Sequence, residues 1–115
     1  MEKIWLAEYK KTGIPESVAL PAENTSLVDI FERNFQKYGS RDAFIFMDKV
    51  LTFNELEVAS RKFATYLQSL NLAKGTRVAV MMPNVFQYPV VALGIFRAGL
   101  VLVNVNPLYT ARELD

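Results

Sequence analysis

The chain has 115 residues, 13 Lys plus Arg against 12 Asp plus Glu, a hydrophobic fraction of 51%, and neither Cys nor His. This length corresponds to one domain, and a chain of this size can bury a hydrophobic core. The lack of Cys and His excludes a disulfide scaffold, a Cys/His zinc site, a thiol nucleophile and any catalytic triad built on imidazole. The net charge of +1 gives no basis for nucleic-acid binding.

Residues 1–24 are predicted to form an N-terminal arm. Gly13, Pro15 and Pro21 follow one another too closely for regular structure. The first eight residues carry charges on both sides of a short apolar patch, so they lack the apolar segment of a signal peptide. The periodic patterns begin at residue 25, and residues 25–115 are predicted to form the start of a folded domain.

The first periodic segment predicts an amphipathic helix of about three turns. Thr25 or Ser26 can act as its N-cap, and Asp29 stands three residues after Ser26, as in a capping box. Gly39 ends the pattern. The apolar residues that repeat at helical spacing are Leu27, Ile30, Phe31, Phe35 and Tyr38.

A hairpin and a second helix are predicted next. Residues 43–47 and 50–53 are short β-prone runs, and the pair Asp48 and Lys49 is predicted to link them. Thr52 and Glu55 form a second capping-box pattern. The helix that follows is predicted to end at residues 71–75, with an apolar face of Leu56, Ala59, Phe63, Leu67 and Leu70.

Residues 77–105 predict a strand, a helix and a second strand. Asn84 is the predicted helix cap, Pro89 predicts a kink or a delayed helix start, and Gly99 ends the helix. Both strands, 77–82 and 100–105, are apolar at nearly every residue, which is typical of parallel strands covered on both faces. The expected fold class is therefore α/β, with a partial parallel or mixed sheet that contains a βαβ unit.

Residues 78–96 carry no formal charge and are long enough to span a bilayer. However, Pro83, Asn84, Gln87 and Pro89 interrupt this run, and their freed polar groups would be unsatisfied in lipid. A buried strand, turn and helix is the favoured interpretation over a membrane span.

The end of the sequence predicts another helix start. Thr110 and Glu113 form a third capping-box pattern, and Asp115 is the last residue, about one turn later. We therefore expect this chain to be the N-terminal piece of a larger α/β protein.

The sequence predicts no catalytic residue and no metal site. Its glycines do not cluster as a phosphate-binding loop requires, and each pair of neighbouring carboxylates is explained by capping or by a solvated helix face. The loop after the last strand is the candidate ligand site, since open α/β sheets bind ligands at the carboxyl ends of their strands. Asn106 and Tyr109 are its candidate residues; the alternative is an Asn-Pro turn that only leads into the next helix.

Five blocks, in this order, carry a resemblance to a known family. The chain resembles the opening of bacterial long-chain fatty acid-CoA ligases, members of the adenylate-forming (AMP-binding) superfamily, over essentially its whole length. The blocks are LTFNEL (51–56), KGTRVAV (74–80), MPN (82–84) with QYP (87–89), GIFRAG (94–99) and VNVNPLYTAREL (103–114).

The resemblance implies a parent enzyme that joins a fatty acid and ATP into an acyl-adenylate, with magnesium on the phosphates, and passes the acyl group to CoA. The family's phosphate loop, adenine and ribose contacts, magnesium-linked Glu and C-terminal Lys lie beyond residue 115. Residues 25–115 would thus be the first part of the adenylation domain and bind no cofactor alone. In relatives that act on short acids a glycine-rich loop lies beside the CoA adenine; here Asn106, Pro107 and Leu108 replace those glycines.

The resemblance also implies a cytoplasmic protein, peripheral on the inner membrane, and a homodimer with contacts through the arm that holds Trp5 and Tyr9. Two other hypotheses rest on the apolar stretch 78–105: a self-associating module without enzymatic activity, and a peripheral membrane element.

Overall fold

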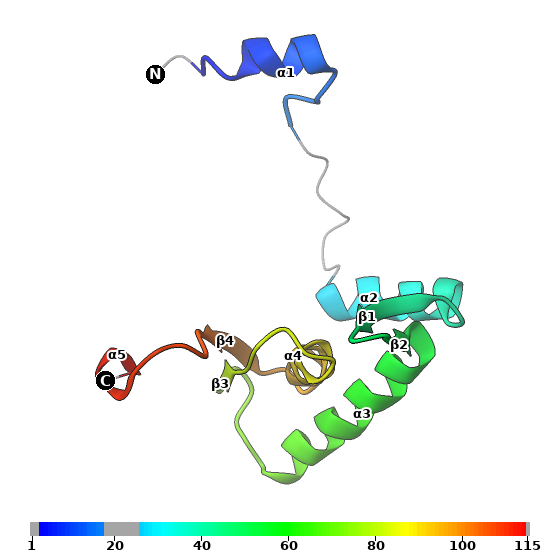
Figure 1. Cartoon of the computed structure of the whole chain (residues 1–115), viewed down its shortest axis with the longest axis vertical. Helices are drawn as coiled ribbons and strands as arrows, with labels where there is room; N and C mark the ends of the chain where they lie inside the picture. Colours follow the sequence, from blue (N-terminus) through cyan, green and yellow to red (C-terminus); the bar gives the residue numbers. More distant parts are fainter. Residues whose placement is uncertain (1–2, 18–25, 115) are drawn as a thin grey trace.

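A computed structural model describes residues 3–17 and 26–114 of the chain (Figure 1). The elements are α1 (Leu6–Thr12), α2 (Leu27–Tyr38), β1 (Asp42–Phe46), β2 (Lys49–Thr52), α3 (Phe53–Ser69), β3 (Arg77–Met81), α4 (Gln87–Arg97), β4 (Val101–Val105) and α5 (Ala111–Leu114). In Figure 1, α2, α3, α4 and the two sheets pack together, whereas α5 follows the last strand at the end of the chain.

The arm contains a helix that the sequence analysis did not predict. α1 ends at Gly13, which adopts a left-handed conformation (φ 71°) and donates its N–H to the carbonyl oxygen of Tyr9. Gly13 is therefore the C-cap of a helix, and its spacing from Pro15 did not rule out regular structure before it. None of the residues of α1 is buried. Pro21 lies outside the described residues.

The predicted capping boxes of α2 and α3 are confirmed. The Ser26 hydroxyl accepts the N–H of Asp29 at 3.1 Å, and the Asp29 carboxylate accepts the N–H of Ser26 at 2.9 Å. Thr52 and Glu55 repeat the arrangement at the start of α3, with distances of 3.3 and 2.8 Å. The alternative cap, Thr25, lies outside the described residues.

The hairpin is present, but its turn lies one residue earlier than predicted. β1 and β2 pair antiparallel, and Phe46 lies opposite Lys49, so Met47 and Asp48 form the turn. Both have positive φ angles, 47° and 61°, as a type I′ turn requires. The prediction of an Asp48–Lys49 link was wrong because it assigned Met47, an apolar residue, to the strand.

The βαβ unit is confirmed. β3 and β4 pair in parallel through α4, and they form a two-stranded sheet separate from the β1–β2 sheet. Val80 packs on the helices and is buried, whereas Met81 and Val101 are 43% and 45% exposed. The expectation that both faces are covered was wrong for the described residues, because α3 and α4 pack on only one face of this sheet.

The start of α4 follows the delayed-start prediction and contradicts the predicted cap. α4 begins at Gln87, and its N-cap is Phe86, which makes no side-chain capping bond, so Asn84 is not the cap. Pro89 is the third helical residue, where a backbone N–H has no partner within the helix. The proline therefore removes no helical hydrogen bond there.

The core lies where α3 crosses α4. One cluster of buried residues joins Leu67, Val80, Ile95 and Leu100, and the other joins Phe35, Leu56 and Leu93. The buried residues of α3 are Leu56, Ser60, Ala64 and Leu67. The predicted face was therefore partly wrong, since Leu70 is 48% exposed and the small residues Ser60 and Ala64 are buried.

Gly94 permits the close approach of the two helices. A Cβ atom at this position would lie 2.6 Å from Cδ1 of Phe63 and 3.2 Å from the carbonyl oxygen of Ser60. The run 78–96 is thus divided between β3 and the packed helix α4, as the favoured interpretation predicted. In the described parts of the chain, no helix has the length and apolar character to cross a membrane.

The helix start predicted from the third capping-box pattern is also confirmed. The Glu113 carboxylate accepts the backbone N–H of Thr110 at 2.8 Å, and α5 follows. Asp115 lies outside the described residues.

Candidate functional site

The loop between β4 and α5 holds the two candidate ligand residues in exposed positions. The Asn106 side-chain oxygen accepts the N–H of Leu108 at 3.0 Å, and its carbonyl oxygen accepts the N–H of Tyr109 at 3.0 Å. Asn106 therefore closes a turn, as the alternative interpretation stated. These bonds use only its oxygens, so the amide NH₂ group is still a donor. The Tyr109 residue is 45% exposed.

A hydrogen bond beside this loop was not foreseen from the sequence. The Tyr88 hydroxyl donates to Oδ1 of Asn104 at 2.9 Å, which joins the first turn of α4 to the carboxyl end of β4. The available signal was Asn104 itself, a polar residue between two valines in an apolar strand. This bond fixes the end of β4 from which the candidate loop departs.

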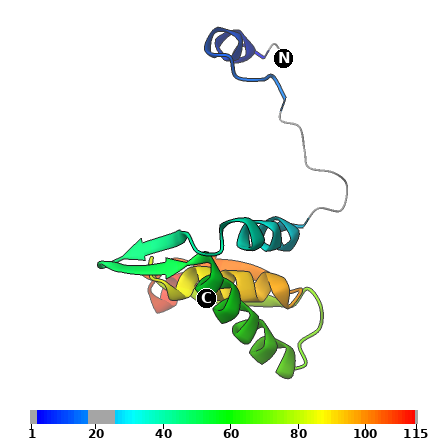
Figure 2. The same cartoon turned by 90° about the vertical axis from the view of Figure 1, so that its right-hand side faces the viewer.

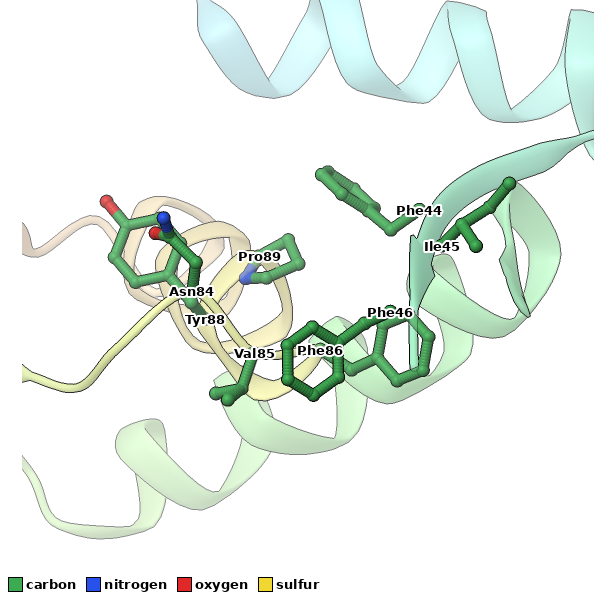
Figure 3. Close-up of a pocket in the computed structure, with 8 residues that line it drawn as sticks. All are labelled: Phe44, Ile45, Phe46, Asn84, Val85, Phe86, Tyr88 and Pro89. Carbon is green, nitrogen blue, oxygen red and sulfur yellow. The ribbon is translucent and has the colours of Figure 1, made fainter. Parts of the chain in front are cut away.

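An apolar cavity of about 400 Å³ lies between the hairpin and the start of α4 (Figure 3). Figure 3 shows Asn84 and Tyr88 at one end and the rings of Phe46 and Phe86 at the other. These two rings meet edge to face, with centroids 5.9 Å apart. A second apolar cavity of about 300 Å³ shares Phe44, Tyr88 and Pro89 with the first. The region between hairpin and helix thus offers apolar contact, with polar groups at one end.

The charged residues of α2, α3 and α4 form a network that sequence reasoning missed. Arg97 of α4 donates to the Glu32 carboxylate and, from Nε, to the Ser60 hydroxyl at 3.1 Å. Arg61 donates to Glu32 at 2.8 Å and to Glu57 at 2.9 Å. The partners of Glu32 are 29 and 65 residues away in sequence, so no local pattern could have revealed them.

Arg97 is the buried member of this network. Its side chain is 9% exposed, compared with 56% for Arg61. The guanidinium Cζ lies 5.5 Å from the centroid of the Phe35 ring, where the ring face attracts a cation. Its Nη2 has no hydrogen-bond partner among the described residues. The network is balanced in charge, two arginines against two glutamates, and it holds three helices together.

The described carboxylates with shifted pKa values are capping groups. The backbone N–H of Ser26 and then its hydroxyl lower the pKa of Asp29. The N–H and hydroxyl of Thr52 lower the pKa of Glu55 in the same way, and those of Thr110 lower the pKa of Glu113. A depressed pKa suits a cap that must stay ionised, not a general acid at neutral pH. These groups therefore organise helices.

A magnesium-ATP site does not fit the described residues. Within residues 3–17 and 26–114, no group of three or more acidic side chains is placed to hold a metal ion. The glycines of the folded part stand at separate helix and turn positions and do not form a phosphate cradle. No step of nucleotide chemistry is therefore assigned to these residues.

Comparison with known proteins identifies relatives over the whole chain. The family model described as AMP-binding enzyme matches residues 31–115. The long-chain-fatty-acid--CoA ligase of Escherichia coli O6:H1 is 52% identical over 100% of this chain, and that of Bacillus subtilis is 40% identical over 99%. The chain spans 20% of the length of each of these ligases.

Solved structures share the fold. The N-terminal subdomain of Klebsiella oxytoca NpsA, in complex with anthranilyl-AMSN, matches 77% of this chain and 24% of its own, with a TM-score of 0.75 and 29% identity. A benzoate CoA ligase from Burkholderia xenovorans matches 75% of this chain and 18% of its own, with a TM-score of 0.70. The chain belongs to the AMP-binding enzyme family, within which it is homologous to the N-terminal part of long-chain fatty acid-CoA ligases.

Proposed function

We propose that this chain is the structural first part of the adenylating domain of a long-chain fatty acid-CoA ligase. The observation that carries the proposal is the 52% identity to such a ligase over the whole chain. The complete enzyme would activate a fatty acid with ATP, release pyrophosphate, and transfer the acyl group to the CoA thiol. Magnesium, ATP and the acyl group would be bound by residues outside this chain.

The role of the chain in that enzyme is to supply a βαβ unit and the helices that pack on it. The parallel β3–β4 pair begins a sheet, and the Arg97 network locks α2, α3 and α4 on one side of it. Polar side chains in the described residues mainly serve helix caps and this network. We infer that this part of the domain is a scaffold, and that the catalytic residues of the complete enzyme lie outside this chain.

A replacement experiment tests this proposal. The first fifth of the Escherichia coli O6:H1 ligase is exchanged for this chain, and palmitate-dependent exchange of labelled pyrophosphate into ATP is measured. We expect the chimera to keep the exchange activity of the native ligase within about tenfold. A chimera that folds, as judged by circular dichroism, but shows no palmitate-dependent exchange would refute the proposal.

We further propose that Asn106 and Tyr109 contact CoA in the complete enzyme. Support comes from the exposure of both residues and from their place after the carboxyl end of a parallel strand. In the chimera, Tyr109→Ala should raise KM for CoA several-fold and leave palmitate-dependent pyrophosphate exchange unchanged, because that step precedes CoA. Leu108→Ala, at an exposed neighbour, is the control. An unchanged KM for CoA in Tyr109→Ala would contradict this contact.

A further inference from the structure

We propose that the outer face of the β1–β2 hairpin, formed by Ile45, Met47 and Val50, is the docking surface for the part of the adenylating domain that follows this chain in the ligases. This inference rests on the proposed function and adds to it a specific surface and its occupant.

The outer hairpin face is apolar and open. Ile45 lies directly opposite Val50 in the strand register, so the two side chains form a cross-strand pair. Ile45 is 70% exposed, Val50 45% and Met47 81%. Adjacent apolar side chains at such exposure mark a surface that another element covers.

The opposite face of the same hairpin is already used. Phe44 lies opposite Leu51, which packs on the buried cluster of Phe35, Leu56 and Leu93. Phe46, two residues after Phe44, meets Phe86 of the α4 region. Ile45 also borders the apolar cavity of Figure 3, but it is 70% exposed. Because strand residues alternate between faces, the Ile45–Val50 pair lies on the opposite face of the hairpin from the Phe44–Leu51 pair. A sheet that is apolar on both faces is typical of a strand layer between two other layers.

The β1–β2 hairpin pairs with no further strand among the described residues. It is a two-stranded sheet, and such a hairpin is marginal in water unless a further strand or layer supports it. Figure 2 shows it extending outward from the helices as a narrow ribbon. Both outer edges of the ribbon carry backbone groups that a further strand could pair with.

The small fraction of its relatives' length that this chain spans indicates what covers the outer hairpin face. It spans 20% of the Escherichia coli ligase, and its match covers only 24% of the NpsA N-terminal subdomain, which is one structural unit. The larger part of that subdomain must pack against the faces that this chain leaves open, because a domain is organised around a shared core. We commit to this following part, in preference to a second copy or a lipid surface, as the cover of the outer hairpin face.

A complementation experiment with matched variants tests the inference. The chain is mixed with the Escherichia coli O6:H1 ligase lacking its matched first fifth, and the dissociation constant is measured by titration with a labelled chain. The double variant Ile45→Thr/Val50→Thr removes apolar surface while keeping β-branched residues. Val58→Thr, on the exposed side of α3 and 51% exposed, is the control, since Val and Thr have similar helix propensity.

The inference predicts that the wild-type chain and Val58→Thr bind equally and that the double variant binds about tenfold or more weakly, as expected for two apolar side chains that lose burial. Equal binding by all three chains, or no binding by the wild-type chain, would overturn it. Sedimentation of the chain alone, and its flotation with phosphatidylglycerol vesicles, complete the test. Self-association or vesicle binding that the double variant abolishes would show a different occupant and also overturn it.

The outcome is separable from the proposed function. Pyrophosphate exchange by the reassembled protein reports the function, whereas the dissociation constants report the interface. If the double variant binds the truncated ligase as tightly as the wild-type chain and restores the same pyrophosphate exchange, the proposed docking surface is contradicted and the proposed function is not. If binding is weakened by the double variant as predicted, but neither the reassembled protein nor the intact chimera shows pyrophosphate exchange, the proposed function is contradicted and the docking surface is not.

Discussion

Arg97 donates its Nε proton to the Ser60 hydroxyl at 3.1 Å, and this bond joins α4 to α3 at a point where Ser60 is fully buried. The same hydroxyl donates to the carbonyl oxygen of Glu57 at 3.0 Å, so its donor and acceptor capacity are both used. With Glu32 on the other side of the guanidinium, one arginine connects three helices.

Removal of Arg97 should destabilise the fold far more than removal of Arg61. Arg97→Ala leaves the Ser60 hydroxyl without its donor and Glu32 without its buried partner, and should lower the free energy of unfolding by about 3 kcal/mol. Arg61 is 56% exposed, so Arg61→Ala should cost less than about 1 kcal/mol. Urea unfolding measures both, and equal losses would contradict the assigned role of Arg97.

The helix crossing at Gly94 should not accept a methyl group. Gly94→Ala places a Cβ atom 2.6 Å from Cδ1 of Phe63, so the helices must separate or the ring must move, at a cost of about 1–3 kcal/mol. In the Phe63→Ala background the contact with the ring is absent and only the contacts at 3.2 Å, with the Cβ atom of residue 63 and the Ser60 carbonyl oxygen, remain, so the same substitution should cost less. Thermal and urea unfolding of the wild-type chain, the two single variants and the double variant measures the coupling energy between positions 94 and 63. A cost that is identical in both backgrounds would show that Phe63 does not set the limit.

The capping carboxylates should make stability depend on pH at the acid end. The pKa of Glu55 lies below its ordinary value of 4.5 because the N–H and hydroxyl of Thr52 bind the ionised form. A group with a lowered pKa stabilises the fold fully above its unfolded pKa, and this contribution is lost as pH falls through the folded value. Glu55→Gln mimics the neutral form, so its deficit relative to wild type should be present at pH 6 and vanish on acidification below 4.5. Urea unfolding across this range checks it, and a deficit that stays constant would contradict the capping account.

Much of the fold could be predicted because its signals are local. Ser26 with Asp29, Thr52 with Glu55, and Thr110 with Glu113 are three residues apart, and each pair fixed a helix start that the structure contains. The apolar runs on both sides of a segment of helix length likewise located the βαβ unit, because each of its three elements is nearly continuous in apolar sequence.

The wrong predictions concern features that depend on contacts between residues far apart in the sequence. The burial of Ser60 depends on Gly94 and Arg97, which lie on another helix, so the apolar pattern of α3 alone placed the core face only partly correctly. The helix start at Gln87 depends on the turn after Pro83, which overrides the capping preference of Asn84. The turn in the candidate loop was one of the two alternatives that the sequence offered. The bond from Tyr88 to Asn104 could not be predicted, because it depends on which end of β4 lies beside α4.

The proposed role of this chain is to supply structure, and not chemistry, to a fatty acid-activating enzyme. It is tested most directly by palmitate-dependent exchange of labelled pyrophosphate into ATP, measured on the purified 115-residue chain beside the chimeric ligase that contains it. We predict exchange by the chimera and none above background by the chain alone. Robust exchange by the isolated chain would contradict the account.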